Sequence, residues 1–340
     1  MGVELTTVAD DEAVFHVDGE VVRYPGLVPD HPYELHGVAV RTLARPPGER
    51  LATVATVNDM HFGEVECGRI DRLDLGPVLR SPPGAVPYPE MMSAAAVAEI
   101  TALGPDAVVA KGDLTAGAST AQFDAFLDCY GTVFGERLHY VRGNHDVAGG
   151  GTVTDRAPFE VTLPGVTLAV VDTAVPGRSS GSVPATTLDW LDDLGARADR
   201  PVLVLGHHHA WLPDTDDSPG GFFGIEADAS RRLVEVVARR PALVAYLSGH
   251  THRNRVVRAA ATGPFPWVEV ACVKDFPGTW AEYRVFEGGI LQVHRRISSP
   301  EALAWTEATR AMFGGLYPGY AFGTLADRCF AIGLRTTASD

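Results

Sequence analysis

The amino-acid sequence predicts an α/β protein with a layered core. Short apolar runs rich in valine alternate along the chain with amphipathic stretches of helical spacing. Most of these runs are followed directly by glycine or polar turn residues, as buried strands of an α/β sheet often are. The composition, 46% hydrophobic and 21% charged over 340 residues, is that of a folded globular chain with one large domain or two ordinary ones.

The individual elements follow from this alternation. We expect buried strands at the apolar runs 51–57, 107–110, 138–141, 166–171, 202–205 and 243–247. Ser119 and Gln122 have the spacing of a capping box, and the apolar face after them predicts a helix that reaches Phe134. Further helices are expected at 89–103, 187–198 and 228–240. After Gly249, closely spaced runs predict a β-meander that closes a sheet, at 255–260, 267–272, 281–286 and 290–295.

Three segments are expected along the chain. Residues 1–50 hold two or three strands, too few for an independent domain, and predict an appended β-element. Residues 51–298 carry the α/β alternation and form the expected central domain. Residues 299–340 begin with a helix and continue into the aromatic run GGLYPGYAFG. This extension either packs on the core, contacts a second copy in a homodimer, or caps a site.

The net charge and the targeting patterns of the sequence limit which partners and which location we expect. The formal net charge is −15 and the sequence pI is near 5.2, so we expect neither a nucleic-acid polymer nor an anionic membrane as partner. The chain lacks a long apolar run and a signal-peptide pattern, and a cytoplasmic location is expected. The four cysteines form no C-x-x-C pair and are expected to be reduced thiols. The chain has two lysines, Lys111 and Lys274, a scarcity typical of a GC-rich bacterial genome.

Metal-binding side chains follow five of the predicted strands. They are Asp59 and His61 after LATVATV, Asp113 after AVVAKG, Asn144 after LHYVRG, His207 after VLVLG, and His250 and His252 after LVAYLSG. Because ligands of α/β sheets bind at the carboxyl ends of the strands, we expect these donors to converge on one edge. Each histidine alone has an ordinary interpretation as a buried or surface residue. The joint pattern indicates a metal centre.

In that order, the blocks D-M-H, G-D, G-N-H-D, a histidine after an apolar strand, and G-H-T-H resemble the calcineurin-like metallophosphoesterase superfamily. The resemblance covers about Leu51 to Arg258, and it is closest to bacterial class III cyclic-nucleotide phosphodiesterases and their uncharacterised relatives. It implies a four-layer α-β-β-α sandwich of two mixed sheets flanked by helices. The metal site would lie at the C-terminal ends of the strands, and residues 51–298 would be the metallophosphoesterase catalytic domain.

The resemblance also implies a binuclear centre with two divalent or trivalent ions, manganese, iron or zinc. Asp59, His61 and His252 would hold one ion. Asn144, His207 and His250 would hold the other, and Asp113 would bridge them. In such a centre the attacking group is a hydroxide that bridges the metals. His145 would assist the leaving group, and Asp146 would orient a ligand or His145 without binding metal itself.

Two departures from the family pattern leave alternatives open. The run His207-His208-His209-Ala210 stands where many relatives have His-His-Pro-Pro. The strand before it favours His207 as the ligand, a shift to His208 stays open, and His208 and His209 are candidate substrate contacts. After G-N-H-D the chain continues V-A-G-G-G, which leaves cyclic-nucleotide specificity open. The loop 213–224, PDTDDSPGGFFG, has the composition of a substrate lid or of a plain surface loop.

The expected function is a cytoplasmic, metal-dependent phosphodiesterase that hydrolyses a small soluble phosphoester resembling a cyclic nucleotide. A phosphomonoesterase and a nucleotide pyrophosphatase are alternatives with the same chemistry. A catalytically idle binding or scaffold protein is the alternative of another class. A single-metal hydrolase built on 207–209 is a third, and metal stoichiometry separates it from the binuclear enzyme.

Overall fold

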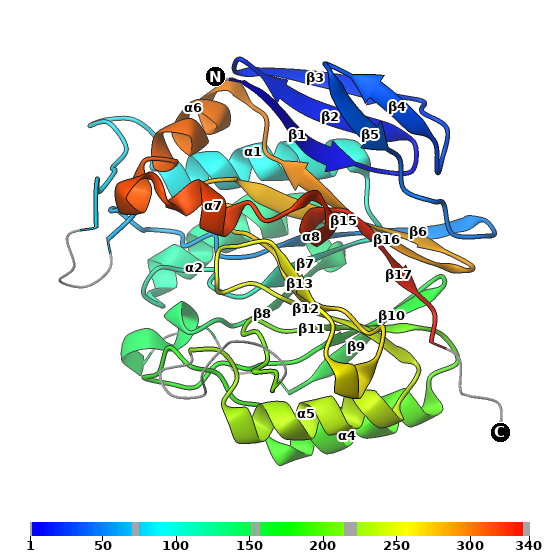
Figure 1. The fold of residues 1–340 in the computed structure, drawn as a ribbon. Coiled ribbons are helices and arrows are strands. Elements are labelled where there is room, and N and C mark those ends of the chain that lie inside the picture. The colour runs from blue at the N-terminus through cyan, green and yellow to red at the C-terminus, as the bar shows by residue number, and fades with distance from the viewer. Residues whose placement is uncertain (1, 70–74, 151–152, 154–156, 214–222, 336–340) are drawn as a thin grey trace.

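Two six-stranded sheets face each other at the centre of the protein, and helices cover their outer faces (Figure 1). The computed structural model describes residues 2–69, 75–150, 153, 157–213 and 223–335. Apolar side chains from both sheets, among them Val54, Val109, Leu205 and Tyr283, form one buried core between them. The expected four-layer α-β-β-α sandwich of two mixed sheets is therefore confirmed.

The first sheet carries four of the predicted ligands, Asp59, His61, Asp113 and Asn144, after three of its strands. Its strand order is β17-β16-β15-β6-β7-β8. The parallel strands are β6 (Arg50–Val57), β7 (Ala107–Lys111) and β8 (Leu138–Val141). The antiparallel strands are β15 (Thr279–Phe286), β16 (Gly289–Arg296) and β17 (Phe330–Gly333). Its outer face packs against α1 (Tyr88–Leu103) and α2 (Thr120–Phe126).

The second sheet carries the other three predicted ligands, His207, His250 and His252, and has the order β13-β14-β12-β11-β10-β9. Its strands are β9 (Phe159–Leu163), β10 (Val166–Val170), β11 (Val202–Leu205), β12 (Leu243–Ser248), β13 (Arg255–Val257) and β14 (Trp267–Glu269). The helices α4 (Ala185–Arg197) and α5 (Ala227–Arg239) cover its outer face. The predicted ligands therefore come from two facing sheets, and the expectation of one sheet edge was wrong.

The expected meander after Gly249 is also wrong. Strands β13 and β14 belong to the second sheet, whereas β15 and β16 belong to the first. Residues 270–278 cross between them. The Val270 N–H donates to the carbonyl of Ser248, the last residue of β12, and the Val273 N–H donates to the carbonyl of Asn58, just after β6, each at 3.1 Å. The spacing of apolar runs cannot reveal this crossing, because each run looks like a strand whichever sheet it joins.

The helix expected after the capping box has three geometries. Ser119 and Gln122 form the reciprocal capping box as predicted, and α2 begins at Thr120. A π-helical turn at Leu127–Gly131 and the short α3 (Thr132–Phe134) continue the same chain direction. Phe126, Tyr130 and Phe134 remain on the buried face, so the predicted apolar stripe holds despite the change in winding.

The N-terminal segment holds five strands, more than the two or three expected. A three-stranded sheet consists of β1 (Val3–Val8), β2 (Glu12–Val17) and β3 (Glu20–Pro25), and β4 (Pro32–Leu35) pairs with β5 (Val38–Arg41). The segment packs on β16 of the first sheet, where the Thr7 hydroxyl donates to the His294 carbonyl at 2.7 Å.

The C-terminal segment packs on the core beside the crossing segment 270–278. It contains α6 (Pro300–Thr309), a 3-10 turn at Met312–Gly315, α7 (Tyr317–Ala321) and α8 (Leu325–Arg328). Trp305 stacks on Tyr88 with 4.4 Å between ring centroids, and its indole N–H donates to the Lys274 carbonyl at 2.8 Å. Among the described residues, no helix has the length and apolar character needed to cross a membrane.

Candidate metal centre

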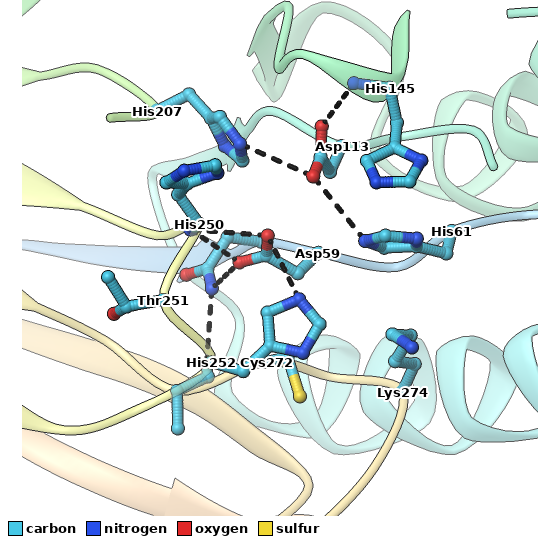
Figure 2. A network of polar contacts seen from close by, with 12 residues as sticks. Asp59, His61, Asp113, His145, His207, His250, Thr251, His252, Cys272 and Lys274 are labelled. Carbon is cyan, nitrogen blue, oxygen red and sulfur yellow. Dashed lines mark hydrogen bonds and ion pairs between the residues drawn. The ribbon is translucent and has the colours of Figure 1, made fainter. Parts of the chain in front are cut away.

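Left-handed backbone marks most of the predicted ligands. Positive φ angles between 49° and 68° occur at Asp59, His61, Asp113, His250 and His252. This conformation is unfavourable for residues other than glycine and persists where surrounding contacts enforce it, often at functional sites. It turns the chain sharply just after β6, β7 and β12, and the side chains converge between the sheets (Figure 2).

Asp113 lies at the middle of the cluster. Its Oδ2 is 3.4 Å from His61 Nε2 and 3.3 Å from His207 Nε2, while its Oδ1 accepts the His145 backbone N–H at 2.9 Å (Figure 2). A Cβ at Gly143 would lie 2.1 Å from Asp113 Oδ1, so the glycine of G-N-H-D is required by this close approach. One carboxylate oxygen thus faces an imidazole from each half of the site, as a bridging ligand must.

The first half of the site groups Asp59, His61 and His252, whose potential ligand atoms lie within 4.8 Å of one another. His252 Nε2 is 3.5 Å from Asp59 Oδ1. Asp59 is fully buried and accepts hydrogen bonds from the Asn58 amide at 2.6 Å and from the His250 backbone N–H at 3.0 Å. These bonds fix the carboxylate in the position that the resemblance implies for a metal ligand.

The second half is built around His207. Its Nδ1–H donates to the Lys111 carbonyl at 2.8 Å, which leaves Nε2 facing Asn144 Oδ1 at 3.2 Å. A Cβ at Gly112 would lie 2.5 Å from His207 Nδ1, so that glycine makes room for the ring. His250 donates from Nε2 to the Phe223 carbonyl at 3.0 Å, and its Nδ1 is therefore the atom with a free lone pair.

These residues fit metal ions. Among the described residues, both ring nitrogens of His61 and Nδ1 of His250 are buried without a hydrogen-bond partner. Burial lowers the pKa of His61, and the neutral imidazole is the form that binds metal. The donors are imidazole nitrogens and carboxylate or amide oxygens without a thiolate, a set that suits manganese, iron and zinc.

His145 is the residue of the cluster best placed to move a proton. Its Nδ1–H donates to the Ala116 carbonyl at 2.9 Å, so Nε2 is the free ring nitrogen, and the residue lines the cavity described below. Its ring centroid lies 4.4 Å from that of His61. An imidazole in this position could exchange a proton through Nε2 with a group bound beside the predicted metal site, the role that the resemblance implies for His145.

Asp146 ties two ligand-bearing loops together. It accepts the backbone N–H groups of Leu114 at 3.0 Å, Thr115 at 2.8 Å and Gly143 at 2.8 Å, and the Thr115 hydroxyl at 2.7 Å. Burial, followed by the charge of Asp113, raises the pKa of its carboxyl to about 6. Its bonds hold the loop after β7 against the loop after β8.

A cavity of about 500 Å³ opens onto the cluster. Its polar side includes His61, Asp113, Asn144, His145, His250 and His252. Its apolar side comes from the C-terminal segment, at Met312, Phe313, Leu316, Tyr317 and Tyr320. Among the described residues, the lining includes neither His208 nor His209, the candidate substrate contacts, and both are buried. Residues 214–222 of the candidate lid lie outside the described residues.

Three charged residues near the site carry no sequence motif and were missed. Glu64, Lys274 and Asp275 line the cavity beside His61 and His252. The two lysines of the chain were the available signal for these charged residues. Both Lys111 and Lys274 are buried at this site, and Lys111 Nζ donates to the Ser248 carbonyl at 2.6 Å. Genome composition can explain why lysine is scarce, but it does not explain why the two that remain are here.

Comparison with known proteins agrees with this geometry. The sequence profile of the calcineurin-like phosphoesterases matches residues 52–254. A cAMP/cGMP dual specificity phosphodiesterase from Mycobacterium tuberculosis is 29% identical over 161 residues, which are 44% of this chain and 49% of that protein, so the match spans about half the length of each. The crystal structure of a dimetal phosphatase from Danio rerio superposes with a TM-score of 0.55 at 13% identity, over 73% of this chain and 97% of that one, and shows the shared fold. The chain belongs to the calcineurin-like phosphoesterase family.

Proposed function

We propose that this protein is a binuclear metal-dependent phosphodiesterase that hydrolyses a small diester with a planar organic group, such as a cyclic nucleotide. The observation that carries the proposal is the position of Asp113, whose Oδ2 lies between His61 and His207 in a cavity that aromatic side chains also line. Family membership makes the chain a metal-dependent phosphoester hydrolase in class. The diester preference and the substrate are the proposal.

The contacts of these residues support a separate role for each group of ligands. Asp59, His61 and His252 would hold one ion, Asn144, His207 and His250 the other, and Asp113 would contact both. Bound there, two divalent ions supply Lewis acidity toward the phosphoryl oxygens and lower the pKa of a nearby water. His145 is part of the cavity lining, where it would lie beside the phosphate group of a bound diester.

His145 is the proposed general acid. Its Nδ1–H is held by the Ala116 carbonyl in both protonation states, so the exchangeable proton is the one on Nε2. When the ester bond breaks, this proton passes to the leaving oxygen, and the neutral imidazole remains anchored. General acid catalysis of this type typically contributes about 10²- to 10⁴-fold to the rate.

The size and chemistry of the cavity favour a small substrate with an apolar part. A volume of about 500 Å³ is within the usual range for small-molecule sites. Phe313, Leu316 and Tyr320 offer a face for a base or another planar ring, whereas the phosphate would meet the polar side. The net charge of −15 disfavours a polyanionic polymer as substrate. The phosphodiesterase from Mycobacterium tuberculosis, as its name states, acts on cAMP and cGMP, and its distant similarity supports the same class.

The test compares bis-p-nitrophenyl phosphate with p-nitrophenyl phosphate, each hydrolysed by protein loaded with manganese, iron or zinc. Asp113→Asn keeps the size of the side chain and removes the charge, and it provides the inactive reference. Asp124→Asn, a substitution of an exposed carboxylate on α2, is the matched control. Preference for the diester, followed by hydrolysis of cyclic nucleotides, is the expected result.

Other outcomes identify the alternatives. Preference for the monoester would make the protein a phosphomonoesterase, and cleavage of dinucleotide or sugar-nucleotide pyrophosphates alone would make it a pyrophosphatase. If the wild-type protein binds metal but is no faster than Asp113→Asn on any of these substrates, the proposal fails and the idle binding protein takes its place. One ion per chain would favour the single-metal hydrolase.

A further inference from the structure

His208 is completely buried beside the second half of the metal site. Its exposed fraction is 0%, and its ring centroid lies 4.8 Å from that of His207 and 4.5 Å from that of His250. The three histidines each offer one nitrogen within 4.8 Å of the others. Among the described residues, they therefore fall within the same distance limit as the three predicted ligands of the first half.

The contacts of His208 select which nitrogen is free. Its backbone N–H donates to the Thr173 hydroxyl at 3.2 Å, and its Nδ1 lies 2.8 Å from the same oxygen. Nδ1 is therefore engaged by Thr173, and when the hydroxyl accepts from both groups, Nδ1 carries the proton and Nε2 keeps its lone pair for a metal. Among the described residues, Nε2 is buried without a hydrogen-bond partner. Burial of a polar atom without a partner is unfavourable, and a ligand on Nε2 would offset this cost.

The surroundings of the ring are shaped to hold it in this position. A Cβ at Gly181 would lie 2.5 Å from His208 Cγ, so Gly181 leaves the space that the imidazole fills. The Tyr246 hydroxyl donates to the His208 carbonyl at 2.8 Å and fixes the backbone. The same device occurs at His207, where Gly112 leaves room for the ring. Both histidines are thus fixed by a small neighbour and by a hydrogen bond to Nδ1.

We infer that His208 is an additional metal ligand, through Nε2, for the ion assigned to Asn144, His207 and His250. This inference rests on the proposed function, because it requires that the site hold two ions. It makes the two halves chemically different. One half offers two imidazoles and two carboxylates, counting Asp113, whereas the other offers three imidazoles, one amide and one carboxylate. A nitrogen-rich site favours zinc, iron or cobalt over manganese or magnesium.

A substrate contact is the competing role for His208. The cavity lining argues against it, because among the described residues it contains His250 and Asn144 but not His208. A substrate on the polar side of the cavity would meet those residues first. The two roles differ in a measurable way, since a ligand changes metal binding in the absence of any substrate.

The test uses the whole protein, stripped with a chelator and titrated with cobalt(II), zinc(II) and manganese(II) separately. His208→Asn keeps an amide near the position of Nδ1 and removes Nε2, whereas His208→Gln places an amide near the position of Nε2. His209→Asn, in the next residue of the same histidine run, is the matched control. Bound metal is counted by elemental analysis, and the visible absorption of the cobalt protein reports the ligands directly.

We expect wild type and His209→Asn to bind two ions per chain with the same cobalt spectrum. His208→Asn should bind one of the two ions at least about tenfold more weakly, with a changed spectrum and a smaller preference for zinc over manganese. His208→Gln should recover part of the affinity. Equal affinity and an unchanged spectrum in His208→Asn would overturn the inference, while wild-type protein that never binds a second ion would overturn the proposed function instead.

If His208→Asn fails to fold, substitutions of Thr173 provide a second test. Thr173→Val removes the oxygen that orients Nδ1 and leaves the imidazole in place, and Thr173→Ser restores the oxygen. If the orientation of the His208 ring matters for metal binding, Thr173→Val should bind one ion more weakly than wild type, and Thr173→Ser should recover the affinity. Identical titrations of the two variants would count against the assignment.

Discussion

Lys274 Nζ lies 2.6 Å from Glu64 Oε2 and 3.4 Å from Asp275 Oδ2, inside the protein. Each carboxylate faces the Nδ1 atom of a predicted ligand: Glu64 is 3.8 Å from that of His61, and Asp275 is 3.6 Å from that of His252. One buried ammonium group therefore joins the two carboxylates behind two histidines of the same metal half. At these distances, which are longer than hydrogen bonds, the carboxylates would act on the two rings through their charge.

Replacing Lys274 by methionine should destabilise both the fold and this half of the site. Burial lowers the pKa of Lys274, but Glu64 and neighbouring anionic groups outweigh it and hold the pKa well above its usual range, so the ammonium is charged. Removing one partner of a buried ion pair typically costs about 3–5 kcal/mol, because the remaining charge is uncompensated. Urea denaturation should show a loss of this size, and elemental analysis should show less bound metal.

The control for this prediction is Arg69→Met. Arg69 also lines the cavity, but it pairs with Glu66 near the surface, and its side chain is 53% exposed. An exposed ion pair contributes at most about 1 kcal/mol. If both substitutions cost the same stability, Lys274 does not have the structural role assigned to it.

His145→Asn should keep both metals and lose turnover in a way that depends on the leaving group. Asparagine can still donate to the Ala116 carbonyl, but it cannot act as an acid. The rate on a cyclic nucleotide, whose leaving alkoxide needs a proton, should fall by about 10²-fold or more. The rate on bis-p-nitrophenyl phosphate, whose leaving phenolate needs little protonation, should fall much less. Equal losses on the two substrates would remove the general-acid role.

The apolar side of the cavity predicts a selective effect on substrate binding. Leu316 is 78% exposed and lines the cavity, so Leu316→Ala should change stability little. Loss of its contact with a base should raise KM for a cyclic nucleotide by about tenfold, within the range for one apolar contact, at nearly constant kcat. KM for a glycerol phosphodiester, which has no ring, should stay unchanged. Leu334→Ala, at an exposed residue outside the described lining of this cavity, is the control.

Sequence reasoning found the residues that lie within motifs and missed those that act through distant contacts. Asp59, Asp113, Asn144 and His250 follow strand ends, and the order of their blocks indicated both the fold and the metal chemistry. The pairing of Glu64 with Lys274 joins residues 210 positions apart in sequence, and neither residue belongs to a recognisable pattern. Thr173, which contacts the Nδ1 of His208, also belongs to no motif, although His208 itself stands in the histidine run that the sequence singled out. A periodicity argument works along one strand or helix, whereas these contacts depend on how the two sheets face each other.

A histidine far from the site allows a test of how the N-terminal segment is held. His16, on β2, is buried, and its Nδ1 lies 3.2 Å from the Thr6 hydroxyl. Burial, and then the charges of Arg296, Arg23 and Arg310, lower its pKa from 6.5 to about 3. Between about pH 3 and pH 6.5, the unfolded chain binds a proton at His16 and the folded chain does not. Its contribution therefore lowers the free energy of unfolding as the pH falls below 6.5.

Between pH 7 and pH 5, His16 should account for a loss of about 2 kcal/mol in the free energy of unfolding, since each pH unit below 6.5 costs about 1.4 kcal/mol. The measurement is urea denaturation of wild type and His16→Asn at both pH values, with the exposed His31→Asn as the control for removing an imidazole from the same segment. The asparagine variant should lose less stability than wild type by that amount. A variant that loses as much as wild type would show that another group is responsible for the acid sensitivity of the protein.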